Sequence, residues 1–215
     1  MSNASRLTLP AIRAALRLPL PGRAAQLHMA VRPRPGDREG LPNPCPKEGA
    51  VLLLLYERGN HLVLPLTQRT ETVEKHRGQI SLPGGAREAL DAGFAQTALR
   101  ETHEELGVPE EAVELLAPLT PLYIPPSRFC VYPFVGYTAG NPALHADPRE
   151  VQQILEVPVE HLLNPQTRVV ERHIQDGQSY EVPVYQVANQ RVWGATAMIL
   201  AEFLALLDTA RAATT

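Results

Sequence analysis

The sequence predicts an α/β (α+β) fold in which a mixed sheet lies between helices, in the manner of an α/β/α sandwich. Apolar runs of strand length, such as Val51 to Tyr56, alternate with a few segments of helical periodicity. The stretch from Ala195 to Leu207 is almost entirely apolar, which is typical of a buried helix. With 215 residues, 44% of them hydrophobic, the chain is long enough for one domain with a sizeable core.

The N-terminal part differs in composition from the rest of the chain. We expect residues 1–46 to form a helix and a Pro-rich extended segment, and residues 47–210 to form the main domain. Thr8 to Leu18 is predicted as a short amphipathic helix with Thr8 as its cap. Arg32 to Pro46 contains five prolines and is predicted as an extended loop.

The remaining elements follow from local patterns. Glu48–Tyr56 and His61–Thr67 are predicted to form a hairpin that turns at Arg58-Gly59-Asn60. Further along the chain, the predicted elements are a strand at 79–82, a helix at 91–106, strands at 113–119 and 129–137, an irregular strand from 151 to 155, a helix at 158–163, and a hairpin of strands 168–174 and 180–187.

Charge and cysteine content limit the functional classes. The formal net charge is −3 and no long basic run is present, which argues against a nucleic-acid surface. No apolar run approaches the roughly 20 residues that span a bilayer, so we expect no membrane segment and a cytoplasmic protein. Cys45 and Cys130 are expected to be free thiols, with a single disulfide as the alternative.

The most informative segment is the predicted helix at 91–106. Glu101, Glu104 and Glu105 occupy offsets of zero, three and four, so their carboxylates share one helix face. Carboxylate oxygens are the ligands that Mg2+ prefers, and Mn2+ suits them as well. The three glutamates are therefore predicted metal ligands, with a merely solvated acidic helix as the alternative. Pro83-Gly84-Gly85 before the helix is predicted as a rigid turn followed by permissive backbone.

This segment resembles the Nudix box, whose pattern is G-x5-E-x7-R-E-U-x-E-E-x-G-U with U an aliphatic residue. The second half matches at Arg100, Glu101, Glu104, Glu105, Gly107 and Val108, with Thr102 in place of the first aliphatic residue. In the first half, Asp91 stands where the pattern has Glu, and the loop that follows is one residue longer. The resemblance implies hydrolysis of a nucleoside diphosphate linked to another moiety, with a small-molecule nucleotide pyrophosphate as the partner.

The residues before the box suggest a branch of that superfamily. Leu66 to Gly85 resembles the block that precedes the box in coenzyme A pyrophosphatases, with Glu74 where that block has Arg. The resemblance implies that coenzyme A or a derivative is the substrate. It also implies a set of substrate-binding residues, namely Arg69, His76, Arg77, Gly84 and Gly85.

Roles follow for two further residues. Arg100 is predicted to orient a box carboxylate through its planar guanidinium. Glu150, in a late loop where relatives keep an acid, is the candidate general base. Two alternatives stay open for the function. One is a different substrate, namely ADP-ribose, NADH or a nucleoside triphosphate, and the other is a Nudix module that binds a nucleotide without catalysis. Assembly as a homodimer also stays open.

Overall fold

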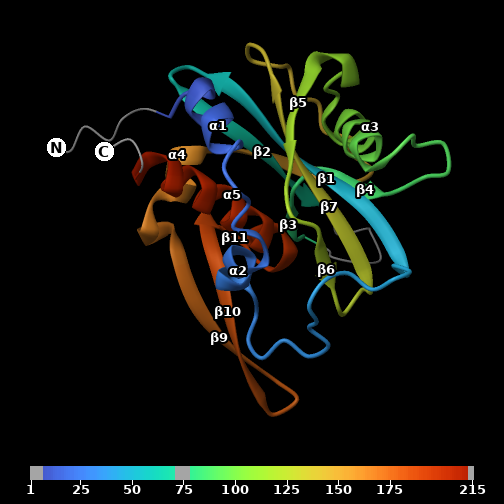
Figure 1. Ribbon diagram of the computed structural model, residues 1–215, viewed down its shortest axis with the longest axis vertical. Coiled ribbons are helices and arrows are strands. Elements are labelled where there is room, and N and C mark those ends of the chain that lie inside the picture. The colour runs from blue at the N-terminus through green and yellow to red at the C-terminus, as the bar shows by residue number, and fades with distance from the viewer. Residues whose placement is uncertain (1–6, 71–77, 213–215) are drawn as a thin grey trace.

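The computed structural model describes residues 7–70 and 78–212. Its helices are α1 (Leu9–Ala15), α2 (Gly22–Gln26), α3 (Phe94–Leu106), α4 (Val159–Leu163) and α5 (Gly194–Ala212). Its strands are β1 (Lys47–Arg58), β2 (His61–Arg69), β3 (Ile80–Ser81), β4 (Gly84–Ala86), β5 (Val113–Pro118), β6 (Leu122–Ile124), β7 (Phe129–Thr138), β8 (Val151–Pro158), β9 (Arg168–Gln175), β10 (Gln178–Val187) and β11 (Gln190–Val192). Figure 1 shows their arrangement.

The main sheet is mixed, as predicted. Its central path runs β3-β2-β1-β7-β5, with β4 added to β1, β6 to β7 and β8 to β2. Strands β1 and β7 run parallel, whereas the other pairings in this sheet are antiparallel. Strands β11, β10 and β9 form a separate antiparallel sheet.

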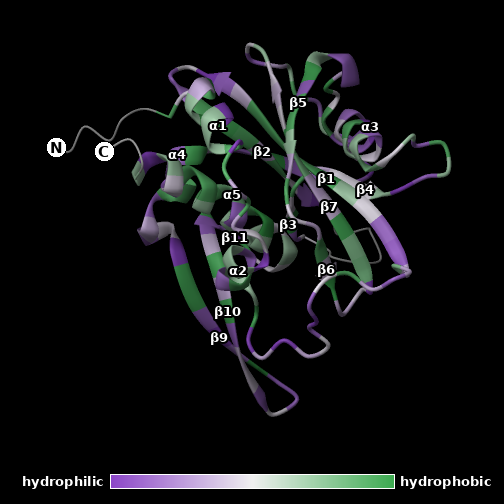
Figure 2. Cartoon of the chain, viewed as in Figure 1, coloured by the Kyte–Doolittle hydropathy of each residue, from purple (hydrophilic) through white to green (hydrophobic). Residues whose placement is uncertain are grey.

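Strand β1 divides the interior into two clusters because successive side chains point to opposite faces of a sheet. Leu53 and Leu55 belong to the larger cluster, which includes the buried residues of α5. Leu52 and Leu54 belong to a smaller cluster with Ala98 and Leu106 of α3. The sheet therefore lies between α3 and α5, as Figure 1 shows. In Figure 2, α5 is coloured mostly as hydrophobic, whereas α3 is largely hydrophilic.

The N-terminal helices pack on α5. Thr8 caps α1 as predicted, since its hydroxyl accepts from the backbone N–H of Ala11 at 3.4 Å. After α2, backbone hydrogen bonds of 2.9 and 2.8 Å join Arg32 to Glu181 of β10. Strand β10 thus anchors the start of the Pro-rich segment. Within residues 7–70 and 78–212, no helix is long and apolar enough to cross a membrane.

Most predicted elements are present, with two differences near the acidic helix. Helix α3 begins at Phe94 instead of Asp91, because the Asp91 carboxylate accepts from the backbone N–H of Glu88 and holds the preceding loop. The prediction of a turn at Pro83-Gly84-Gly85 is wrong for the two glycines, because Gly84 and Gly85 belong to strand β4 and pair with β1. Strands β4, β6 and β11 and helix α2 were not predicted.

The expectation of two free thiols is wrong, because Cys45 and Cys130 form a disulfide. The cause lies in the strand pairing. Strands β1 and β7 are in parallel register with Glu48 beside Cys130, and Cys45 lies three residues before Glu48. This brings the two Cα atoms to 6.2 Å, within the usual range for a disulfide.

Candidate active site

Arg100 organises the loop before α3. Its Nε and Nη2 donate to the two oxygens of buried Asp91 at 3.0 and 3.2 Å, and Nη2 also donates to the Ala86 carbonyl at 3.1 Å. The Arg100 guanidinium lowers the pKa of Asp91, and hydrogen bonds from Glu88 and Thr97 act in the same direction. The same ion pair raises the pKa of Arg100. The pair therefore fixes the loop to the helix.

The other side of the guanidinium reaches two glutamates of α3. Arg100 Nη1 lies 3.0 Å from Glu101 Oε1 and 3.0 Å from Glu104 Oε2. The side chain of Glu101 is 15% exposed and that of Glu104 is 54% exposed. Arg100 thus makes the contacts that an orienting residue requires.

Glu101 packs directly on the backbone of β4. A Cβ atom placed on Gly85 would lie 2.5 Å from the Glu101 carboxylate, so a side chain at position 85 would displace it. Burial raises the pKa of Glu101, while the Arg100 guanidinium opposes the shift. Glycine at position 85 is what allows this close approach.

Glu105 is the most buried of the three acids, with 3% of its surface exposed. Burial raises its pKa to about 8, although Arg69 and the backbone N–H of Gly84 favour the charged form, and the charges of Glu101 and Glu150 raise it further. The nearest side-chain donor is Thr67, whose hydroxyl lies 3.5 Å away. Glu105 is therefore a carboxylate with incomplete compensation for its charge.

Glu150 approaches this group from the loop before β8. Arg69 bridges the two acids, with Nη1 at 3.6 Å from Glu105 and Nη2 at 3.5 Å from Glu150. The backbone N–H groups of His145 and Asp147 donate to the carbonyls of Leu106 and Glu105, which ties the loop to the end of α3. A residue far from the box in sequence is thus held against it.

The end of α3 has the predicted geometry. Gly107 adopts φ +72°, and its N–H donates to the His103 carbonyl at 2.8 Å. Glycine tolerates this left-handed conformation at little cost, which explains the stop directly after the acidic residues. Thr102, which replaces an aliphatic residue of the box, is buried and donates to the Ala98 carbonyl at 2.7 Å.

The donor chemistry of the site fits a divalent cation. Burial is the main cause of the raised pKa values of Glu101 and Glu105, and the charge of Glu150 raises both further. In the part of the chain that the structure describes, no three acidic, histidine or cysteine side chains are grouped closely enough to hold an ion as they stand. Arg69 supplies the positive charge between Glu105 and Glu150. A hard cation would serve the same oxygen atoms.

A cavity of about 1490 Å3 opens beside these residues. Arg69, Gly84 and Gly85 line it, and all three are predicted substrate-binding residues. Other lining residues come from the Pro-rich segment, the loop after β6, strands β9 and β10 and the start of α5. The other two predicted substrate residues, His76 and Arg77, lie outside the described ranges, as does Glu74.

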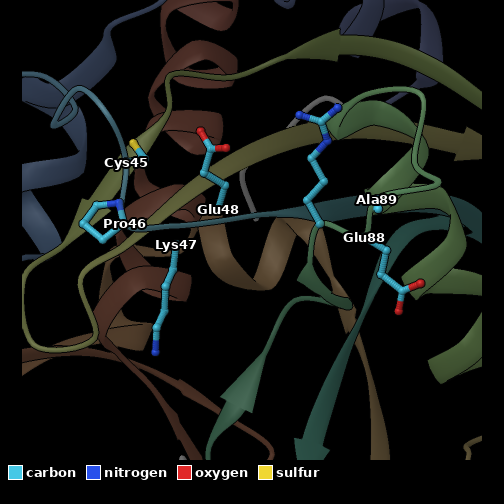
Figure 3. Close-up of a pocket in the computed structure, with 7 residues that line it drawn as sticks. Cys45, Pro46, Lys47, Glu48, Glu88 and Ala89 are labelled. Carbon is cyan, nitrogen blue, oxygen red and sulfur yellow. The ribbon is translucent and has the colours of Figure 1, made fainter.

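A second, smaller pocket of about 330 Å3 lies at the start of β1 and is lined by residues 45–48 and 87–89. Figure 3 shows Lys47 and Glu48 pointing to opposite sides of the strand. None of the predicted site residues that lie within the described ranges lines this pocket.

Two contributions to the site were missed from the sequence. Asp91 was placed only as a shortened substitute for the box glutamate, although its spacing of nine residues from Arg100 was a signal for their pairing. The wall built by β9, β10 and Trp193 carries no local signal, since it depends on how the two sheets pack.

Comparisons with known proteins point to one family. A family model described as the NUDIX domain matches residues 46–175. The uncharacterized Nudix hydrolase NudL of Photorhabdus laumondii is 34% identical over 154 residues, which cover 72% of this chain and 81% of that protein. NudL of Citrobacter koseri is 36% identical over 160 residues, covering 73% of this chain and 80% of that protein.

Solved structures share the fold at low sequence identity. The Nudix hydrolase RenU of M. smegmatis has a TM-score of 0.51 and 16% identity, with 77% of this chain and 86% of that chain covered. A MutT protein of Methanosarcina mazei Go1 has a TM-score of 0.50 and 15% identity, covering 77% of this chain and 94% of that chain. The mixed sheet with its flanking helices is therefore that of solved Nudix proteins.

Proposed function

The chain belongs to the Nudix hydrolase family, and on that premise we propose that it cleaves coenzyme A, or a derivative, into 4'-phosphopantetheine and 3',5'-ADP. The family acts on a nucleoside diphosphate linked to another moiety. The observation that carries catalysis is the group of Glu101, Glu105 and Glu150 beside Gly84 and Gly85, which line the cavity. A binding module has no need for a costly cluster of acids.

The choice of coenzyme A rests on the block from Leu66 to Gly85. Among the predicted substrate-binding residues, the arginines Arg69 and Arg77 are the candidates to pair with the 3'-phosphate of this substrate. The contacts of Arg69 with Glu105 and Glu150 favour a different role, because its charge is already used at the carboxylates. Arg77 then remains the candidate from this block for the 3'-phosphate.

Glu101, Glu104 and Glu105 are the proposed ligands of Mg2+ or Mn2+. When bound, the cation neutralises charge on the substrate phosphates and makes the attacking water more acidic. Arg100 holds the carboxylates of Glu101 and Glu104 in place. The buried Asp91 carboxylate in turn fixes the orientation of the Arg100 guanidinium. Glycine at position 85 leaves room for the Glu101 carboxylate against the backbone of β4.

Glu150 is the proposed general base. Its side chain is 52% exposed, so water reaches it, and the N–H groups of the loop hold it near the end of α3. In this role Glu150 accepts a proton from the water that attacks phosphorus, and Arg69 orients its carboxylate.

A substrate panel tests the proposal. Coenzyme A, ADP-ribose, NADH and a nucleoside triphosphate are incubated with the protein and Mg2+ or Mn2+, and products are separated by chromatography. We expect the highest kcat/KM for coenzyme A. Equal or better turnover of ADP-ribose rejects the substrate but keeps the hydrolase. If no compound is hydrolysed although nucleotides bind, the proposal of an enzyme is rejected and the chain is a non-catalytic binding module.

A further inference from the structure

The large cavity is lined by residues of two kinds. Arg69 and the β4 glycines lie next to the carboxylates. An apolar wall includes Val31, Ile124, Val182, Trp193 and Ile199. A substrate in this cavity can place its pyrophosphate near the charged residues and an uncharged group against the apolar wall.

Trp193 is the most distinctive residue of the apolar wall. It is the single tryptophan of the chain and is 36% exposed. Five other large hydrophobic residues of the described ranges are also exposed, but none of those five lines this cavity. An indole that faces a cavity offers a broad flat surface to a ligand. Covering this apolar surface removes it from water, which favours binding.

The backbone around Trp193 is well anchored. Strand β11 ends at Val192, which pairs with Tyr185 of β10, and helix α5 starts at Gly194. Gly194 adopts φ +65°, a conformation that suits glycine at this sharp change of direction. The hydroxyl of Thr196 donates to the Ile80 carbonyl at 3.3 Å and ties the start of α5 to β3. The indole is thus presented from a fixed position.

Arg191 and His173 also line the cavity, and they share one carboxylate partner. Arg191 Nε donates to Glu171 Oε1 at 2.9 Å, and His173 Nε2 lies 3.0 Å from Glu171 Oε2. The Glu171 carboxylate offsets the charge of Arg191, and Asp176 adds a negative charge to the lining, so this part of the cavity is a poor site for a second anionic group.

We propose that Trp193 is a specificity-determining residue that stacks on the nucleobase of the substrate. A base can place its flat face on the indole while its polar edges point away from the apolar residues. The amide-rich arm of phosphopantetheine would instead lose hydrogen bonds against Val182 and Ile199. The inference rests on the coarser part of the proposed function, a substrate that contains a nucleoside, and is independent of coenzyme A itself.

Intrinsic fluorescence tests this directly, because Trp193 is the only tryptophan. The unmodified protein is titrated with ADP and, separately, with 4'-phosphopantetheine, both at constant Mg2+. We expect a saturable change in emission with ADP and none with 4'-phosphopantetheine. A response to 4'-phosphopantetheine, or no response to ADP, overturns the inference. Neither result depends on which substrate the enzyme hydrolyses.

Kinetics of variants provide the second measurement. Trp193→Ala should raise KM for the substrate found in the panel about fivefold to a hundredfold, with kcat within about threefold, as expected for loss of one base stack. Trp193→Phe should retain most of the affinity. Val170→Ala is the matched control, because Val170 is exposed on β9 and does not line the cavity. An unchanged KM in Trp193→Ala, or a loss confined to kcat, overturns the inference. If Trp193→Ala does not fold, the Phe variant and the fluorescence titration decide.

Discussion

Glu105 and Glu202 are buried glutamates on the two long helices, and their surroundings differ. Glu202 of α5 is 0% exposed and accepts hydrogen bonds from Gln26 Nε2 at 2.9 Å, the Thr120 hydroxyl at 2.5 Å and the Thr120 N–H at 3.2 Å. Glu105 of α3 is 3% exposed, and its side-chain contacts are longer, at 3.5 Å to Thr67 and 3.6 Å to Arg69.

The difference separates a structural carboxylate from one placed for chemistry. Donors from two distant segments surround Glu202, so it joins α2 and the segment before β6 to α5. The pKa of Glu105 is raised because its surroundings stabilise the ionised carboxylate less than water does. Buried groups that remain under-compensated are typical of sites that await a ligand or an ion.

The substitution Glu105→Gln should have the largest effect of all, and this effect should be on kcat. We expect a loss of kcat of about a hundredfold or more, comparable with removal of a preorganised electrostatic group. The free energy of unfolding of the metal-free protein should not fall, since a neutral amide replaces a poorly solvated acid. Steady-state kinetics and thermal unfolding measure both. Glu111→Gln, at an exposed glutamate, is the control; full turnover by Glu105→Gln contradicts the prediction.

The second effect is a pH dependence of the metal-free protein. The pKa of Glu105 is about 8 in the folded state and near 4.5 in the unfolded chain, so the folded state binds more protons between these values. Its contribution to stability is complete below about pH 4.5 and is lost as the pH rises towards 8. With EDTA, Glu105→Gln should therefore gain several degrees in Tm over the unmodified protein at pH 8, and almost none at pH 5.

Mg2+ provides the control for that experiment. A cation that binds the ionised carboxylate stabilises the folded protein, so Mg2+ should narrow the difference in Tm at pH 8. A difference in Tm that is constant from pH 5 to pH 8 would mean that Glu105 ionises normally in the folded state.

The substitution Glu202→Gln should have the opposite outcome to Glu105→Gln, with a loss of stability and little change in kcat. The amide replaces one acceptor oxygen by an NH2 donor. In either orientation this donor faces a donor of Gln26 or of Thr120, so a buried hydrogen bond is lost. We expect a loss of about 1 to 3 kcal/mol in the free energy of unfolding. The kcat of the folded variant should stay within about threefold of the unmodified enzyme. Denaturant unfolding monitored by circular dichroism measures the change; stability equal to that of the unmodified protein would remove Glu202 from its structural role.

Glu150→Gln should give the smallest of the four effects. As the proposed base it should lower kcat about tenfold, towards the low end for general-base catalysis, because bound metal also acidifies the water. Stability should change by less than about 0.5 kcal/mol, since the side chain is half-exposed. Normal turnover would make Glu150 a solvated loop residue that contacts Arg69.

Local patterns predicted the elements of the fold better than they predicted the environment of the acids. The apolar runs of β1 and α5 are properties of consecutive residues, so a strand of the sheet and its covering helix were accessible from the sequence. The offsets of Glu101, Glu104 and Glu105 indicated a shared face. Which of the three is buried depends on Thr67, Gly84 and Arg69, which pairing of distant strands brings to the helix.

The same reason explains the missed features. The pairing of Cys45 with Cys130 depends on the parallel register of β1 and β7. The burial of Glu202 depends on Gln26 and Thr120, which are 176 and 82 residues away in sequence. A sequence pattern reports which face a residue occupies, but a nonlocal contact decides what covers that face.

The two hydrogen bonds between Arg32 and Glu181 bear on how this protein can be shortened. The stretch that matches the family model, residues 46–175, excludes both partners of that bridge and all of α5. A fragment cut at those borders would expose the β-sheet face that α5 covers, and it would lack Val31, Val182 and Trp193 of the cavity. The residues that match the family model and the residues that a stable fragment needs therefore have different boundaries in this chain.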